Sequence, residues 1–202
     1  MLDQGVNILI KLDMRMKKEI SLRIVQGYEV SSQIISQIEF NGRYRKELIP
    51  YLRRLCIEKM FEEFSKDFFD IKVKKNKAKN FTYIELHTEN IIMTVNFVSN
   101  SNKLPRKSLF RNELSESLNY DLFSFEDLNL NKYKNERYIH VVHSGNNKLE
   151  RLYLVLPDKT NLKPLLIENL DIKKSVNKDV EEIKDIINIK IKDELNGKAQ
   201  TS

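Results

Sequence analysis

Four short runs rich in β-branched and aromatic residues constrain the fold of this chain most strongly. The first pair is FTYIEL and IIMTVNF, with the polar tetrad HTEN between them. The second pair is RYIHVVH and LERLYLVLP, with the tetrad SGNN between them. Such runs favour extended strands, and polar tetrads rich in Gly or Asn favour tight turns. The sequence therefore predicts two β-hairpins that join into one antiparallel sheet of about four strands.

Apolar residues repeat at helical spacing before the first hairpin. One stripe predicts a helix within residues 6–26, and a second short helix is expected to end at Gly42, which tolerates the left-handed conformation of a helix end. The clearest helix follows Pro50, with apolar residues at every fourth position: Leu52, Cys56, Met60, Phe64 and Phe68. Its charged residues, including the pairs Arg54/Glu58 and Lys59/Glu63, are expected on the outside.

Two further helices are predicted in the second half of the chain. The spacing of Phe110, Leu114 and Leu118 predicts a helix between the hairpins that covers one face of the sheet. Ser175 and the apolar positions after it predict a last helix that ends near Gly197. This order of elements indicates an α+β protein rather than alternating βαβ units. We expect one domain over residues 1–197, helical over 1–70 and sheet-containing over 71–197, with a disordered tail at 198–202.

Composition and the single cysteine bear on the compartment. Hydrophobic residues make up 41% of the 202 residues, which is enough for a packed core. Cys56 has no cysteine partner, so an internal disulfide is excluded and a reducing, cytoplasmic location is expected. Charges interrupt every apolar run near the N-terminus, so we expect neither a signal peptide nor a membrane span.

Two basic segments point to nucleic acid as a partner. The chain has 35 Lys and Arg against 29 Asp and Glu, a net charge of +6, which permits binding to phosphates. The first segment carries five lysines followed by aromatic residues, and the second precedes and enters the helix between the hairpins. The predicted phosphate contacts are Lys72, Lys74, Lys75, Lys77, Lys79, Lys103, Arg106, Lys107 and Arg111. A solvated lysine loop is the structural alternative for the first segment.

Catalytic and metal-site motifs are absent from the sequence. There is no glycine-rich phosphate loop, CxxC, HExxH or GxSxG, so we expect no metal, no cofactor and, on balance, no enzyme. The candidates for catalysis are His87, His140 and His143, two of which would have to meet at one cleft in a metal-independent ribonuclease. His140 and His143 are three positions apart in a predicted strand, which places them on opposite faces.

Two other interpretations remain open. Residues 32–52 fit a helix-turn-helix that would insert Arg43, Arg45 and Lys46 into a major groove, although Pro50 interrupts the second helix. The alternative for that segment is a structural helical hairpin. Because no catalytic set is evident, the chain is also consistent with a non-catalytic inhibitor or adaptor that docks on another protein through a helix or an exposed strand.

Overall fold

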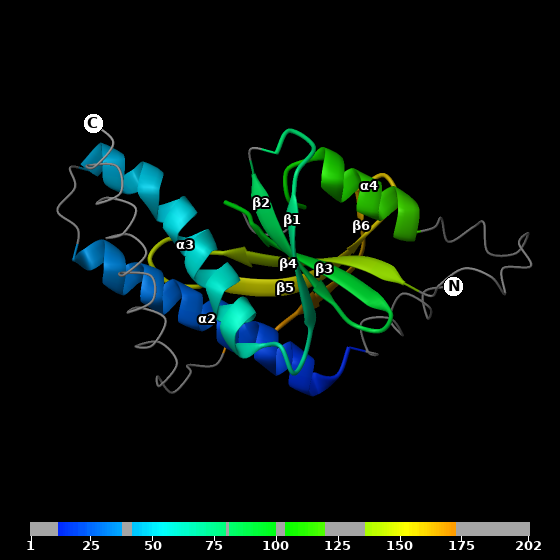
Figure 1. Ribbon diagram of the computed structural model, residues 1–202, viewed down its shortest axis with the longest axis horizontal. Helices are drawn as coiled ribbons and strands as arrows, with labels where there is room; N and C mark the ends of the chain where they lie inside the picture. Colours follow the sequence, from blue (N-terminus) through cyan, green and yellow to red (C-terminus); the bar gives the residue numbers. More distant parts are fainter. Residues whose placement is uncertain (1–11, 38–41, 80, 100–103, 120–135, 173–202) are drawn as a thin grey trace, which may run out of the picture.

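The computed structural model describes residues 12–37, 42–79, 81–99, 104–119 and 136–172 (Figure 1). Within these residues the chain forms three helices and six strands, labelled as in Figure 1. The helices are α2 (Met14–Ser36), α3 (Gly42–Phe64) and α4 (Leu109–Leu118). The strands are β1 (Asp70–Lys75), β2 (Thr82–His87), β3 (Ile91–Phe97), β4 (Arg137–Ser144), β5 (Arg151–Pro157) and β6 (Pro164–Asn169). The α+β class predicted from the sequence is confirmed.

The six strands form one mixed sheet in the order β1-β2-β3-β4-β5-β6. Both predicted hairpins are present, as β2–β3 and β4–β5. However, β3 and β4 run parallel, with Thr94 beside His140 and Phe97 beside His143. The expected sheet of four antiparallel strands is therefore wrong in strand number and in the direction of one pair. Turn residues determine the pairing within a hairpin, whereas the connection that contains α4 determines how the two hairpins join.

The two strands that the sequence did not predict, β1 and β6, are the edges of the sheet. In β1, Ile71 and Val73 alternate with lysines, and Val73 is exposed. The strand β6 begins at Pro164 and is mostly exposed. Lysine and proline are common at sheet edges because they discourage pairing with another chain, and they weaken the strand signal in the sequence.

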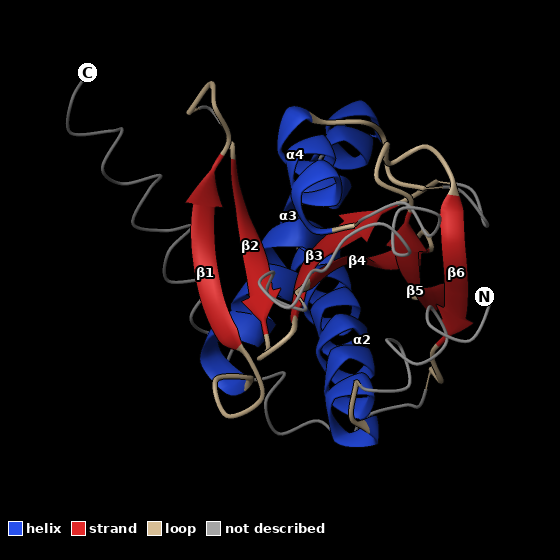
Figure 2. Cartoon of the chain, turned by 90° about the vertical axis from the view of Figure 1, so that its right-hand side faces the viewer, coloured by secondary structure: helices blue, strands red, loops and turns tan. Residues whose placement is uncertain are grey.

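The helices α2 and α3 pack along each other on one face of the sheet (Figures 1 and 2). Gly27 of α2 allows their close approach, because a Cβ atom there would lie 2.8 Å from the Cα atom of Ile57. The two helices expected before Gly42 are thus one helix that ends at Ser36. Gly42 begins α3 instead of ending a helix, and Pro50 lies inside α3. The pair is a helical hairpin packed on the sheet, which is the structural alternative to a helix-turn-helix.

The main core lies between this helix pair and the sheet. Its largest buried side chains include Ile20, Ile24, Ile57, Phe61, Leu86, Met93 and Ile139. The predicted apolar face of α3 is confirmed at Leu52, Cys56 and Met60, which are buried against α2. Strand alternation places every second residue of β3 and β4 on the other face. The core therefore leaves Thr94, Asn96 and His140 facing away from α2 and α3.

The helix α4 lies on this second face. Asn119, at its C-terminal end, donates to the carbonyl oxygens of Tyr138 and Pro157 at 3.0 Å each and accepts from the Tyr138 backbone N–H at 2.9 Å. These bonds hold α4 against β4 and β5, so the prediction of a helix covering the sheet is confirmed. The predicted C-terminal helix, the tail at 198–202 and Lys103 lie outside the described residues.

Candidate functional site

The sheet opens between β2 and β3. Their pairing runs from His87–Ile92 to Glu85–Thr94 and stops there, although β2 continues back to Thr82 and β3 on to Phe97. The β1–β2 hairpin diverges from β3 beyond this point (Figure 2). A crevice of about 220 Å³ lies in the opening. A break in the strand pairing, rather than a loop, thus creates this crevice next to α3.

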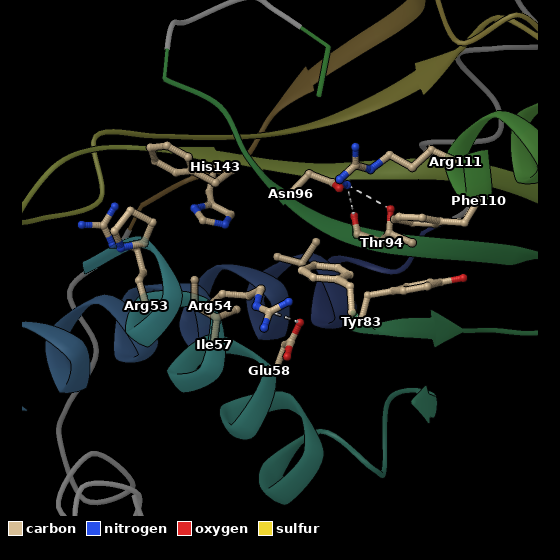
Figure 3. Close-up of a pocket in the computed structure, with 14 residues that line it drawn as sticks. Arg53, Arg54, Ile57, Glu58, Tyr83, Thr94, Asn96, Phe110, Arg111 and His143 are labelled. Atoms are coloured by element: carbon tan, nitrogen blue, oxygen red, sulfur yellow. Dashed lines mark hydrogen bonds and ion pairs between the residues drawn. The ribbon is translucent and has the colours of Figure 1, made fainter. Parts of the chain in front are cut away.

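Three elements besides the two strands contribute to the walls of the crevice (Figure 3). The helix α3 lies on one side of the sheet and α4 on the other, and β4 contributes a single residue. The lining residues are Pro50, Arg53, Arg54, Ile57, Glu58, Phe81, Tyr83, Thr94, Val95, Asn96, Phe97, Phe110, Arg111 and His143. Three of these fourteen residues are arginines, which gives the crevice a cationic lining.

The first arginine, Arg53, holds the neighbouring turn. It is 5% exposed, and its guanidinium donates to the carbonyl oxygens of Gly145, at 2.8 Å, and Asn146. Gly145 has a φ of +145°, and a Cβ atom there would collide with the Lys148 carbonyl oxygen, so the turn requires glycine. The ring of Tyr28 lies 4.3 Å from the Arg53 guanidinium carbon. Arg53 is therefore largely committed to the fold.

Arg54 and Arg111 are much less committed. Arg54 donates one hydrogen bond, to the Thr82 carbonyl oxygen at 3.0 Å, and its guanidinium carbon lies 4.2 Å from the Phe81 ring centroid. Arg111 donates to the Arg106 carbonyl oxygen and lies 5.0 Å from the Phe110 ring centroid. A guanidinium has five N–H donors, so most of the donors of both residues are unused within the described structure.

The Nε atoms of all three arginines are buried without a hydrogen-bond partner. A buried donor left without a partner costs about 1–3 kcal/mol. Burial also lowers the pKa of the Arg111 guanidinium. Buried polar groups are nearly always paired, so these three Nε–H groups stand out as donors that the described residues leave unsatisfied.

Glu58 is the only carboxylate among the lining residues. Its side chain is 15% exposed, and its Oε1 atom lies 4.0 Å from the Arg54 Nε atom, too far for a hydrogen bond. Burial raises the pKa of Glu58 to about 7; Arg54 opposes this shift and Glu62 adds to it. Near neutral pH the carboxyl group is thus partly protonated and neutralises Arg54 only in part.

Aromatic rings surround one end of the crevice. Tyr83 of β2 and Phe110 of α4 are stacked, with ring centroids 3.9 Å apart and planes inclined by 20°. Both rings are half-buried, so part of each remains open to solvent. The stack joins the β1–β2 hairpin to α4 across the opening in the sheet. The crevice thus combines cationic side chains with flat apolar surfaces.

A chain of hydrogen bonds fixes the polar wall formed by β3. The Asn96 side-chain amide donates to Thr94 Oγ1 at 2.9 Å, and Thr94 Oγ1 lies 2.6 Å from the Tyr138 hydroxyl oxygen. That hydroxyl lies 3.1 Å from His140 Nδ1, and His140 Nε2 lies 2.8 Å from Asn161 Oδ1. Each member of the chain is buried and paired, so this wall is rigid before any ligand arrives.

The three histidines do not form a catalytic pair at the crevice. His143 lines it from the α2/α3 face, with Nδ1 2.9 Å from the Tyr28 hydroxyl oxygen, whereas His140 faces α4, as the strand period predicts. Burial lowers the pKa of His140 to about 4 and that of His143 to about 3. His87 Nε2 contacts Glu85 Oε2 at 2.8 Å. Of the three rings, one lines the crevice, whereas a two-histidine mechanism needs two rings at one cleft.

The structure brings the two predicted basic segments together beside the crevice. Lys74 is the β1 neighbour of Tyr83, and Lys77 forms an ion pair with Glu113 of α4. Arg106 and Lys107 are exposed just before α4, and Arg111 lines the crevice itself. The rest of the first segment divides between β1, with Lys72 and Lys75, and the following turn, with Lys79.

Sequence analysis missed Arg53, Arg54 and Glu58. The pair Arg54/Glu58 was interpreted as an exposed pair on α3, an interpretation that fits Lys59 and Glu63, whose Nζ and Oε1 atoms lie 2.8 Å apart at the surface. Glu58 differs from Glu63, because its side chain is 15% exposed against 36%. Arg54 differs from Lys59 because it donates to a backbone carbonyl oxygen of β2. Only the arrangement of the strands could have distinguished the two pairs.

Comparisons with protein-family models, curated proteins and solved structures found no match. In the described part of the chain, none of the helices is long and apolar enough to cross a membrane. The same residues contain no cluster of three His, Cys, Asp or Glu side chains suited to a metal ion. The functional argument therefore depends on the geometry of the crevice and its surroundings.

Proposed function

We propose that the protein binds single-stranded nucleic acid on the face where β1, β2 and α4 meet. The observation that carries the proposal is the pairing of two under-used arginines, Arg54 and Arg111, with a half-exposed aromatic stack in one crevice. Guanidinium groups suit phosphate oxygens because they donate two parallel hydrogen bonds. Aromatic rings stack on unpaired bases of any sequence.

The surrounding charges support the same partner. Lys72 and Lys74 project from β1 on the face that carries Tyr83, and Arg106 and Lys107 lie before α4. Lysines around an aromatic cleft attract a phosphate backbone at long range and orient it toward the cleft. A duplex keeps its bases stacked inside, so a narrow aromatic crevice favours a single strand over a duplex.

The test is a fluorescence anisotropy titration with labelled single-stranded RNA and DNA and with a duplex, at 50 and 200 mM salt. We expect binding to single strands that weakens steeply with salt, because the lysines release counterions from the backbone. The double variant Lys72→Gln/Lys74→Gln should bind several-fold more weakly and show a salt slope smaller by about 2.

The matched control is Arg15→Gln/Lys18→Gln, which removes the same charge from exposed positions of α2. Its affinity should stay close to that of the parent protein. Equal losses in both double variants would show that net charge alone drives the binding, and no detectable binding of any strand at 50 mM salt would rule out the proposed function.

A second candidate function is docking on another protein. The edge strand β6 favours it, because Leu165 and Ile167 are 37% and 42% exposed along a sheet edge that no other described strand pairs with. A Leu165→Lys/Ile167→Lys variant should then lose a partner captured from nuclease-treated lysate, while the Lys72→Gln/Lys74→Gln variant should retain it. The reverse pattern would support nucleic acid.

A further inference from the structure

The shape of the crevice suits the end of a ligand better than a continuous chain. The crevice ends at Glu85 and Thr94, where the pairing of β2 with β3 begins. The helix α3 lies on one side of it and α4 on the other. Its volume of about 220 Å³ is below the roughly 300–1,000 Å³ of pockets that enclose a drug-sized molecule. It therefore has room for a phosphate group and part of one attached nucleoside.

The donors in the crevice suit a terminal phosphate. Arg54 on α3 and Arg111 on α4 approach from opposite faces of the sheet, with Thr94 and Asn96 between them (Figure 3). A guanidinium can bind one phosphate through two parallel N–H donors, and both arginines have terminal N–H groups that the described residues leave unused. A terminal phosphate offers three free oxygens and up to two negative charges, whereas a phosphate within a strand offers two oxygens and one charge.

The aromatic end of the crevice suits the attached base. The stacked rings of Tyr83 and Phe110 are half-buried, and Lys74 lies beside Tyr83 on the next strand. If a base stacked on the exposed part of these rings, its own phosphate would point toward the arginines. The rest of the strand would then run toward the lysines of β1. The crevice thus presents arginines, aromatic rings and lysines in the same order as the phosphate, the base and the following nucleotides of a phosphorylated strand end.

We propose that this crevice binds the phosphorylated terminal nucleotide of a single strand, with the phosphate between Arg54 and Arg111 and the base against Tyr83 and Phe110. The inference rests on the proposed function and specifies which part of the strand is recognised. A free nucleoside monophosphate presents the same chemistry and serves as the minimal probe. The lysines of β1 then contact the strand that follows.

The experiment compares single-stranded oligonucleotides of one sequence that carry a 5′-phosphate, a 3′-phosphate or hydroxyl groups at both ends. Binding of each is measured by anisotropy, and binding of adenosine monophosphate and of adenosine is measured by titration calorimetry. We expect one phosphorylated oligonucleotide to bind at least tenfold more tightly than the hydroxyl form, and the monophosphate to bind measurably where adenosine does not.

Two variants of Arg111 test whether the preference for a phosphorylated end arises in the crevice. Arg111→Gln should reduce the preference for a phosphorylated end to within about twofold, and it should weaken binding of the hydroxyl-ended strand by a clearly smaller factor than binding of the phosphorylated strand. Arg111→Lys should restore only part of the preference, because lysine retains the charge but not the two parallel donors. The control Arg15→Gln should retain the full preference. Circular dichroism and thermal melts show whether each variant is folded. Arg54→Gln provides a second, independent substitution in the crevice.

The outcomes separate this inference from the proposed function. If strands bind but phosphorylated and hydroxyl ends bind equally, the inference fails and the proposed function stands. If no strand binds while adenosine monophosphate does, the protein has a mononucleotide site and both the strand-end inference and the proposed function fail. If the phosphorylated end is preferred and Arg111→Gln and Arg54→Gln both leave that preference intact, the recognition lies outside the crevice and the inference fails.

Discussion

Buried or half-buried arginines occur in two regions of this molecule with opposite hydrogen-bonding patterns. In the first, on α2, Arg23 donates from Nε to Glu19 at 2.7 Å and from Nη1 to the Gln26 side chain at 2.9 Å, and Ser65 donates to the same Glu19 at 2.7 Å. In the second, the crevice, Arg54 and Arg111 leave most donors unused. We call the first region the closed cluster, because its charged groups bond to one another and stabilise the fold. The second is the open cluster, because its unused donors are suited to a ligand.

The closed cluster should produce the largest effect on stability. Glu19→Ala removes an acceptor of both Arg23 and Ser65 and leaves the buried Arg23 guanidinium without this carboxylate. We expect the free energy of unfolding to fall by about 3–5 kcal/mol, measured by urea denaturation. The affinity of the folded variant for a phosphorylated strand should stay unchanged. A loss of less than about 1 kcal/mol would show that this cluster is not a structural support.

The buried histidines should make the fold sensitive to acid. Because the pKa of His140 in the fold is about 4, below its ordinary value, the unfolded chain takes up a proton below about pH 6.5 that the folded protein does not. Stability should therefore fall as the pH falls, by about 2 kcal/mol from His140 between pH 7 and 5.

A His140→Gln variant should remove that part of the pH dependence, as measured by urea denaturation at both pH values. The comparison between variant and parent cancels the carboxylates that titrate in both proteins. An identical pH dependence in the two would contradict the assignment of a buried, neutral His140.

Much of the architecture away from the crevice could be predicted from the sequence, whereas the crevice itself could not. Local signals were sufficient for both hairpins and for the buried face at Leu52, Cys56 and Met60, because turn chemistry and periodicity act over a few residues. The parallel pairing of β3 with β4 and the divergence of β2 depend on contacts between distant segments. Glu58 and Arg54 consequently looked like an ordinary surface pair, and the basic segment that contains Arg111 gave no sign that this residue lines a crevice.

In the open region, Glu58 should produce a pH dependence of opposite sign. Its pKa in the fold, about 7, lies above its ordinary value of 4.5, so stability is lost as the pH rises through this window. Glu58→Gln removes the carboxylate. We expect the stability of the variant relative to the parent protein to increase by about 3 kcal/mol between pH 4.5 and 8, measured by urea denaturation.

A matched control is Glu47→Gln, an exposed carboxylate on the same helix, for which the relative stability should change by less than about 0.5 kcal/mol. If Glu58→Gln and Glu47→Gln behave alike, Glu58 is solvated and the crevice is more open than described.

The central claim is that Arg54 and Arg111 of the crevice serve a ligand rather than the fold. The most direct measurement determines both the free energy of unfolding and the affinity for a phosphorylated single strand of Arg111→Gln in one buffer. We predict an affinity at least tenfold lower than that of the parent protein, with the free energy of unfolding changed by less than about 1 kcal/mol. An unchanged affinity with a loss of several kcal/mol in stability would contradict the claim and place Arg111 with the structural arginines.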